Sequence, residues 1–304
     1  MPEPLSQLGS RGLTENYEEG ARIVSGLQDL DGPNVNPVCQ TRFYTHGRRT
    51  PRALVLLHGF TNCPQQFDVI GRLFHAQGWN VVIPRYPRHG YKDRLNNSIS
   101  ELRADHLLAV ANRSADAAHA LGDHVTVAGL SLGGSLAGHL AQNHQFVDRA
   151  VLIAPMFGLK HVPGGLSRVL GRLAYLLPNF YLWWDPRFKE RLPPPYGYPR
   201  FSTHAYASLL RIAAGVAGAA RVVPPKAKHI AVMTNAAEPG LENRFTYRIV
   251  AGWREHGANV ETHEFPLSDR LPHDLIDPGN PDSNTELVYP IVTRLIEGAP
   301  EGAA

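Results

Sequence analysis

Ser131 lies at the centre of the segment Gly-Leu-Ser-Leu-Gly-Gly, residues 129–134. A β-branched run precedes this segment at 124–128, and a run of small residues follows it at 135–142. The order predicts a strand, a tight turn and a helix, the context in which G-x-S-x-G forms a nucleophile elbow. The two flanking glycines leave room where the strand meets the helix, and a strained turn would present Ser131 Oγ in a cleft. A plain glycine-rich turn is the alternative.

A second motif, His58-Gly59-Phe60-Thr61, follows a buried apolar run and precedes a predicted helix. Acyl transfer needs hydrogen-bond donors for the oxygen on which negative charge develops. We expect the backbone N–H groups of Phe60 and Leu132 to form this oxyanion hole, because the motif has the required place in the chain before the elbow. A simple glycine turn after a strand is the alternative. His58 is expected to orient the loop and not to transfer protons.

A serine nucleophile needs a base, and the chain has 15 histidines. His273 follows the last predicted strand in the loop Leu271-Pro-His-Asp-Leu-Ile276, where the order serine, acid, histidine requires the base. His263 lies inside that strand and is the weaker competitor. The sequence therefore predicts His273 as the general base.

The third member of the triad must hold the imidazole tautomer and stabilise the imidazolium. We expect Glu238, which follows the predicted strand 229–234 and precedes His273 by 35 residues. A carboxylate that begins a helix is the alternative, and Glu242 can fill that role instead. Three aspartates lie near the histidine in sequence, but this adjacency does not give a hydrogen bond to its ring: Asp269, Asp274 and Asp277.

Strand and helix signals alternate along most of the chain, which predicts an α/β fold with a mostly parallel sheet and helices on both faces. The predicted strands are 38–44 at an edge, 53–57, 79–83, 124–128, 149–154, 229–234 and 259–265. The predicted helices are a short one near 17–30, then 64–77, 99–121, 242–256 and 287–296.

Residues 157–226 interrupt this alternation because they carry no strand signal but many aromatic residues and prolines. We predict a helical cap inserted into a hydrolase core of residues 1–156 and 227–304, with residues 1–36 as a peripheral segment. Trp183 and Trp184 are the candidate substrate-binding residues of this cap. A pair of helices that belongs to the core is the alternative.

Composition limits the classes of protein that fit. Of the 304 residues, 43% are apolar and 19% charged, and the net charge of +3 is too small and dispersed to favour nucleic acid. No apolar run spans a bilayer, and the first residues lack the pattern of a signal peptide. Cys39 and Cys63 do not have metal-ligand spacing, so we expect reduced thiols, no metal, no other cofactor and a cytoplasmic location. Composition does not indicate an oligomeric state.

These motifs, in this order, resemble the α/β-hydrolase superfamily, close to bacterial carboxylesterases and monoglyceride-lipase-like serine hydrolases. The resemblance extends from about Val38 to Ile296 and includes the segment 84–90, similar to a Pro-x-x-x-Gly-His-Gly loop but with Arg88 where glycine is usual. Glu238 is a second departure, because aspartate is the commoner acid in this family. The resemblance implies an α/β-hydrolase fold with a cap and the hydrolysis of an ester.

The sequence thus predicts a serine carboxylesterase for small-molecule esters with short to medium acyl chains. Thioesters, amides or carbon–carbon bonds are alternatives for the same triad, because one fold hosts many chemistries. A ligand-binding receptor with a very slow or absent reaction is an alternative of another class. A purely structural domain leaves the elbow, the oxyanion loop and the late histidine unexplained.

Overall fold

The computed structural model describes residues 15–160 and 174–298. Within them, a seven-stranded sheet has the order β1-β3-β2-β4-β5-β8-β9, with β1 antiparallel to β3 and the other neighbours parallel. Its strands are β1 (Arg42–Tyr44), β2 (Thr50–Leu57), β3 (Asn80–Ile83), β4 (Gly122–Leu130), β5 (Val147–Ile153), β8 (His229–Asn235) and β9 (Val260–Phe265). The predicted mostly parallel sheet is confirmed.

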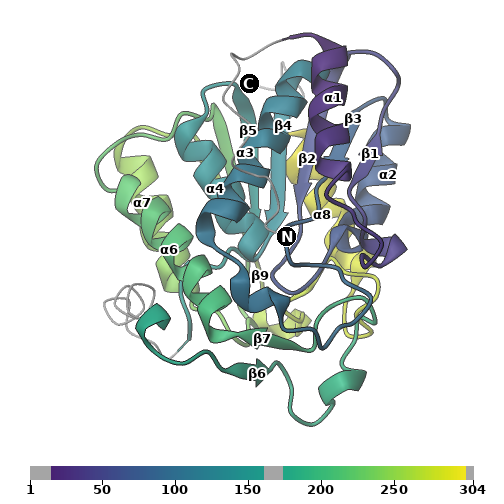
Figure 1. Ribbon diagram of the computed structural model, residues 1–304. Helices are drawn as coiled ribbons and strands as arrows, with labels where there is room; N and C mark the ends of the chain where they lie inside the picture. Colours follow the sequence, from purple (N-terminus) through teal and green to yellow (C-terminus); the bar gives the residue numbers. More distant parts are fainter. Residues whose placement is uncertain (1–14, 161–173, 299–304) are drawn as a thin grey trace.

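Helices cover both faces of this sheet (Figure 1). They are α1 (Tyr17–Gln28), α2 (Asp68–Ala76), α3 (Ala104–Leu121), α4 (Leu132–Asn143), α6 (Thr203–Ala219), α7 (Asn243–Glu255) and α8 (Thr285–Glu297). Helices α2 and α8 pack on one face, and α3, α4, α6 and α7 pack on the other, with α1 against α3. The α/β-hydrolase arrangement expected from the sequence is therefore present.

Strand β2 shows why a continuous apolar run forms the middle of the sheet. Successive side chains on a strand point to opposite faces. Accordingly Ala53, Val55 and Leu57 join the core under α3 and α4, while Leu54 and Leu56 join the core under α2 and α8. All five are fully buried, so β2 needs apolar residues at every position and not only at alternate ones.

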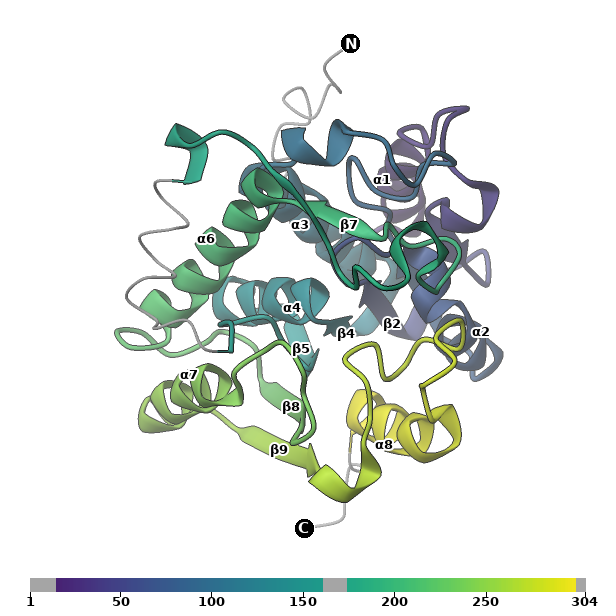
Figure 2. The ribbon, with the colours of Figure 1, turned by 90° about the horizontal axis from the view of Figure 1, so that it is seen from below.

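The described part of the inserted segment differs from the all-helical prediction. It contains an antiparallel ribbon of two short strands, β6 (Tyr181–Trp183) and β7 (Arg200–Ser202). Each strand has three residues, which is too short for an alternating pattern to be visible in the sequence. Figure 2 shows β7 next to α3, to one side of the ends of β4 and β2. Helix α6 follows β7, and its apolar residues belong to the main core beside α4. Residues 161–173 lie outside the described part.

The expectation of reduced thiols is wrong: Cys39 and Cys63 form a disulfide, with their Cα atoms 5.2 Å apart. Cys39 ends a short 3₁₀ helix, η2 (Pro37–Cys39), and Cys63 precedes another, η3 (Pro64–Phe67). The two short helices pack together and bury both sulfurs with Val35. Neither the composition nor the spacing of the two cysteines predicts this contact between segments 24 residues apart.

None of the helices in the described ranges combines the length and the apolar stretch needed to cross a bilayer. In the same ranges, no group of three or more His, Cys, Asp or Glu side chains has an arrangement that holds a metal ion.

Candidate active site

Ser131 lies between β4 and α4 with a positive φ of 57° and a ψ of −113°. A residue with a side chain rarely adopts such a backbone, so the turn is strained. A Cβ added at Gly129 would collide with the backbone of Gly133, and one added at Gly133 would collide with the carbonyl of Leu57. Strand and helix therefore approach closely only because both flanking residues are glycines, and this approach holds the serine at the apex.

The two expected oxyanion donors, the N–H groups of Phe60 and Leu132, have no hydrogen-bond partner among the described residues. Leu132 is the first residue of α4, where an N–H has no carbonyl one turn earlier to bind. Phe60 lies in the loop after β2, followed by Thr61 in the left-handed region with φ 63°. Both amides are therefore available for a developing oxyanion.

Glu238 and His273 are in direct contact. Glu238 follows β8 and is only 2% exposed, and its Oε2 lies 2.8 Å from Nδ1 of His273, which follows β9. Its other oxygen, Oε1, accepts the N–H groups of Gly240 and Leu241 at 3.0 and 3.2 Å. Because Nδ1 donates to the carboxylate, Nε2 of His273 is the ring atom left to accept a proton.

The pKa values of this pair reflect their contact. Burial acts to raise the pKa of Glu238, but the charge and hydrogen bond of His273 and two backbone N–H groups outweigh it, so the pKa is lowered. Burial acts to lower the pKa of His273, yet the charge and hydrogen bond of Glu238, with a contribution from Asp274, raise it to about 9. The pair is thus an anionic acid beside a strengthened base.

Ser131, Glu238 and His273 line one cavity of about 700 Å³, together with Phe60. Its apolar wall comes from both the sheet domain and the insertion: Met156, Leu159, Phe188, Tyr206, Leu209 and Leu241. Ser131 Oγ makes no hydrogen bond to His273 in the described structure. Such bonds are often long in free enzymes and tighten when substrate binds.

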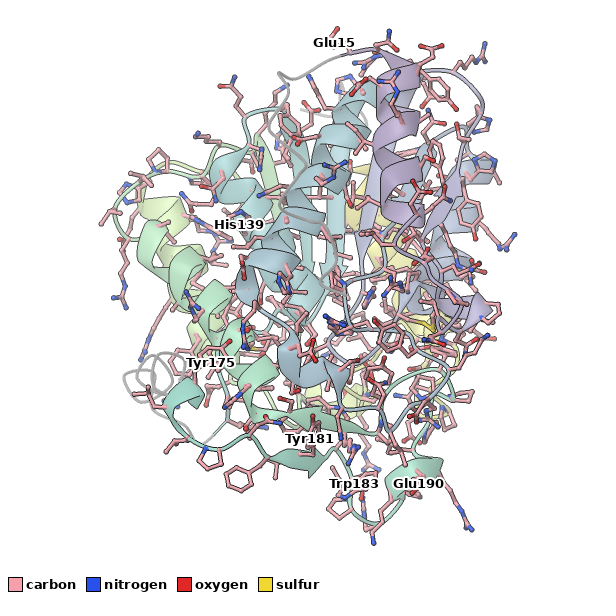
Figure 3. The ribbon with its side chains drawn as sticks, viewed as in Figure 1. Glu15, His139, Tyr175, Tyr181, Trp183 and Glu190 are labelled. Atoms are coloured by element: carbon pink, nitrogen blue, oxygen red, sulfur yellow. A yellow bond between two sulfur atoms is a disulfide. The ribbon has the colours of Figure 1, made fainter. Side chains whose placement is uncertain are left out.

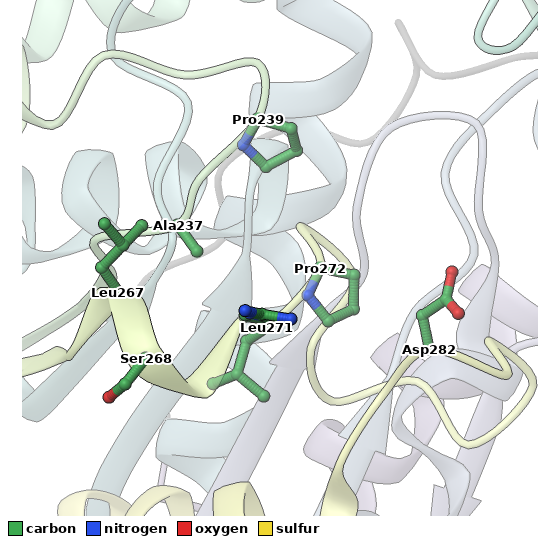
Figure 4. A pocket seen from close by; sticks show the side chains of 8 residues that line it. Ala237, Pro239, Leu267, Ser268, Leu271, Pro272 and Asp282 are labelled. Carbon is green, nitrogen blue, oxygen red and sulfur yellow. The ribbon is translucent and has the colours of Figure 1, made fainter.

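A larger groove, about 800 Å³, lies outside this site (Figure 4). It lies between the loop of Glu238 and the loop that leads to His273, and is lined by Ala237, Pro239, Leu267, Ser268, Arg270, Leu271, Pro272 and Asp282. It is wide open, and neither Ser131 nor His273 lines it. The residues expected to form the triad therefore line the cavity of about 700 Å³ and not this groove.

The two tryptophans of the insertion have different surroundings. Trp184 lines the cavity, and its Nε1–H donates to Thr61 Oγ1 at 2.9 Å. The backbone N–H of Tyr198 donates to Thr61 O at 2.7 Å, so the insertion holds the oxyanion loop at two points. Trp183 is not among the described residues that line the cavity; it is at the lower margin of the molecule in Figure 3, beside Arg200.

The other residues considered above for the base and the acid have different hydrogen-bond or ring partners. His263 lies within β9 with its ring against Phe265. Glu242 caps the start of α7 and pairs with Arg244, which is the role considered for it above. Asp269 contacts Ser268.

The structure also shows the surroundings of His58 and the backbone conformation of Arg88. His58 is fully buried, its ring lies 3.9 Å from that of Tyr86, and burial first of all lowers its pKa well below the usual value. Its Nδ1 lies 2.9 Å from the carbonyl oxygen of Gly59, and its Nε2 accepts the N–H of Tyr86 at 3.4 Å. Arg88 has a φ of 64°, the left-handed region that favours glycine, so glycine at the equivalent place in the resembling loops suits this backbone.

Sequence reasoning missed a set of buried polar contacts behind the site. Gln66 and Asn62 follow the oxyanion loop and bind Asp274 and Asp277, which follow His273, at 3.2 and 2.9 Å. The only signal is the pattern His-Asp-Leu-Ile-Asp, in which two acids flank apolar residues directly after the expected base.

Comparisons with known proteins show the family and the fold of the chain. A model of the Alpha/beta hydrolase family matches residues 54–277. No curated protein sequence matches the chain. Among solved structures, one from a study of the metagenome-derived lipolytic enzymes LipS and LipT is 17% identical, with a TM-score of 0.67 over 86% of this chain and 99% of the other.

Two further similar structures are lipases. A monoacylglycerol lipase of Paleococcus ferrophilus is 14% identical, with a TM-score of 0.62 over 84% of this chain and 98% of its own. A soluble variant of the monoglyceride lipase of Saccharomyces cerevisiae, solved with a substrate analogue, is 12% identical, with a TM-score of 0.61 over 84% and 91%. At these identities the likeness shows a shared fold.

Proposed function

Because the chain belongs to the alpha/beta hydrolase family, we propose that it is a serine hydrolase that cleaves carboxylic esters through an acyl-enzyme. The observation that carries the proposal is the 2.8 Å contact between buried Glu238 and His273 Nδ1, in one cavity with the strained Ser131. The similar structures are lipolytic enzymes and lipases, which supports the choice of esters among the bonds that this triad can cleave.

In the proposed reaction, Ser131 Oγ attacks the ester carbonyl while Nε2 of His273 takes its proton. The negatively charged oxygen of the tetrahedral intermediate accepts hydrogen bonds from the N–H groups of Phe60 and Leu132. The intermediate collapses, and His273 returns the proton to the leaving alcohol. Water then gives a proton to His273 and attacks the acyl carbonyl; the second tetrahedral intermediate collapses, His273 returns the proton to Ser131 Oγ, and the carboxylic acid is released.

Labelling and rapid kinetics test this proposal directly. A p-nitrophenyl ester with a short acyl chain should give a fast release of nitrophenol followed by many turnovers per molecule. An alkyl phosphonate that reacts with activated serines should add one adduct mass, on the peptide that contains Ser131. Release of no more than one nitrophenol per molecule would instead support the receptor alternative, and an adduct on another serine would contradict the assigned nucleophile.

We further propose that residues 157–226 act as a cap over the core and that Trp184 limits the depth of the acyl site. Wild-type kcat/KM should rise by about fourfold per methylene and then fall once the apolar wall is filled, with the optimum at short to medium chains. Trp184→Ala should move the optimum to longer chains.

Two variants separate the roles of this side chain. Trp184→Phe keeps an aromatic wall but loses the hydrogen bond to Thr61 Oγ1, so it should lower kcat for all chain lengths without moving the optimum. Trp183→Ala should lower the melting temperature and leave the optimum in place, because its neighbours are in the ribbon. A wild-type profile that is flat from acetate to palmitate would contradict the capped site.

A cytoplasmic location stays a prediction. One of its two supports was the expectation of reduced thiols, and the Cys39–Cys63 disulfide removes that support.

A further inference from the structure

Gln66 connects the oxyanion loop with the loop of the base. It is fully buried in η3, its Oε1 accepts the N–H of Gly59 at 2.8 Å, and its Nε2 donates to Asp274 Oδ1 at 3.2 Å. An amide has one accepting and one donating end, so the bond to Gly59 fixes the donating end toward Asp274. The position next to His273 therefore requires an acceptor, which an ionised carboxylate supplies.

Asp274 lies among charges that influence its own ionisation. Burial is the largest influence on Asp274, and together with the carboxylates of Asp277 and Glu238 it raises the pKa of Asp274 above the usual value; the charge of His273 and the hydrogen bond from Gln66 act to lower it. Tyr196, from the insertion, and Tyr289, in α8, also face this cluster; burial first and then the charge of Asp277 raise the pKa of both, and Asp274 adds to the rise for Tyr196. Gln66 and a positive His273 thus oppose the rise in the pKa of Asp274 that burial and the neighbouring carboxylates cause.

On the premise that His273 is the base of the proposed reaction, we propose that Asp274 is a positioning residue that acts through it. Held by Gln66, Asp274 is a second carboxylate that favours the imidazolium, while Glu238 alone binds and orients the ring. Because Gly59 directly precedes Phe60, the same contact fixes the oxyanion donor relative to the base. The charge that develops on His273 in the transition state is therefore opposed by two carboxylates and not by one.

A second connection keeps these loops together without Asp274. Asp277 is fully buried and accepts the amide of Asn62 at 2.9 Å, the N–H of Gly279 at 2.8 Å and the hydroxyl of Tyr196 at 2.5 Å. It therefore joins the oxyanion loop, the base loop and the insertion. Removal of the charge at Asp274 leaves this brace in place, so the two effects can be measured separately.

Asp274→Asn tests the charge with little change of shape, because its side-chain oxygen can still accept the bond from Gln66. We expect the pKa of His273, followed by side-chain ¹H–¹⁵N NMR and assigned with a His273→Gln variant, to fall by about 1. The acid limb of kcat/KM should move to lower pH by the same amount, since the base must be neutral to act. Asp269→Asn is the matched control: it removes an equal charge on the same loop and should leave both values unchanged.

Gln66→Met provides the second test. It removes the donor that favours ionised Asp274, so the pKa of His273 should fall in the same direction but by less. It also leaves the Gly59 N–H unpaired, so kcat should fall at every pH. An unchanged titration of His273 in Asp274→Asn would overturn the inference; if that variant does not fold, an unchanged titration in Gln66→Met would do so. The NMR titration needs no substrate, so it can be interpreted even in a protein without esterase activity. A lack of esterase activity would contradict the proposed function but would not change the result of the titration.

Discussion

Replacement of Ser131 by alanine is expected to lower kcat for ester hydrolysis by on the order of 10⁵–10⁶. In the proposed mechanism the reaction loses the atom that attacks the carbonyl. The fold should persist, because the backbone bonds of residue 131 to Ile153 and Met156 do not involve Oγ. Steady-state kinetics with a p-nitrophenyl ester and a melting curve measure both effects.

Ser135→Ala is the matched control for this variant. Ser135 lies one turn further along α4, is fully buried, and donates to the carbonyl of Met156 at 2.6 Å. Its loss should lower the melting temperature and leave phosphonate labelling intact, whereas Ser131→Ala should abolish labelling. If Ser131→Ala kept a tenth of the wild-type activity, the proposed mechanism would be wrong.

Glu238→Gln is expected to lower kcat by roughly 10³–10⁴. The side-chain oxygen of the glutamine would remain where Oε1 of Glu238 accepts the N–H groups of Gly240 and Leu241. Its NH₂ group would then face Nδ1 of His273 and force the ring proton onto Nε2. In that tautomer the ring cannot take the proton of Ser131, and the imidazolium also lacks its main counter-charge.

Two carboxylates that are not in contact with His273 serve as controls for this variant. Glu242→Gln changes an exposed cap of α7, and Asp269→Asn changes the loop before the base. Both should keep kcat within about a factor of two of the wild type, as is usual for surface changes. If Asp269→Asn were the crippling change and Glu238→Gln the mild one, the acid would have to be reassigned and the rest of the scheme would stand.

The fold was predictable where local pattern and burial agree. The seven sheet strands were expected within a few residues of their observed bounds, because parallel strands covered on both faces carry long apolar runs, as β2 does. The first strand was the least accurate: it was expected from residue 38, but residues 37–39 form a 3₁₀ helix that begins with Pro37. An edge strand with half-buried residues gives a weak signal of its start.

The candidate site was predictable from order along the chain and not from local pattern alone. Glu238 and His273 are 35 residues apart, but each lies in the loop after one of two neighbouring strands, so the topology brings them together. No such rule predicts the contact of Gln66 with Asp274, because the two residues are 208 positions apart and their contact depends on the shape of the loops. The Cys39–Cys63 bond was missed for the same reason.

The order of the strands has a consequence for how the protein loses activity on heating. Ser131 and Phe60 follow β4 and β2 in the middle of the sheet, whereas Glu238 and His273 follow β8 and β9 at one margin, with β9 outermost. Marginal strands open at lower free energy than central ones. A molecule that frays at this margin keeps its nucleophile and oxyanion donors but loses its acid and base together. We therefore expect activity on an ester to be lost at a lower temperature than the fold itself.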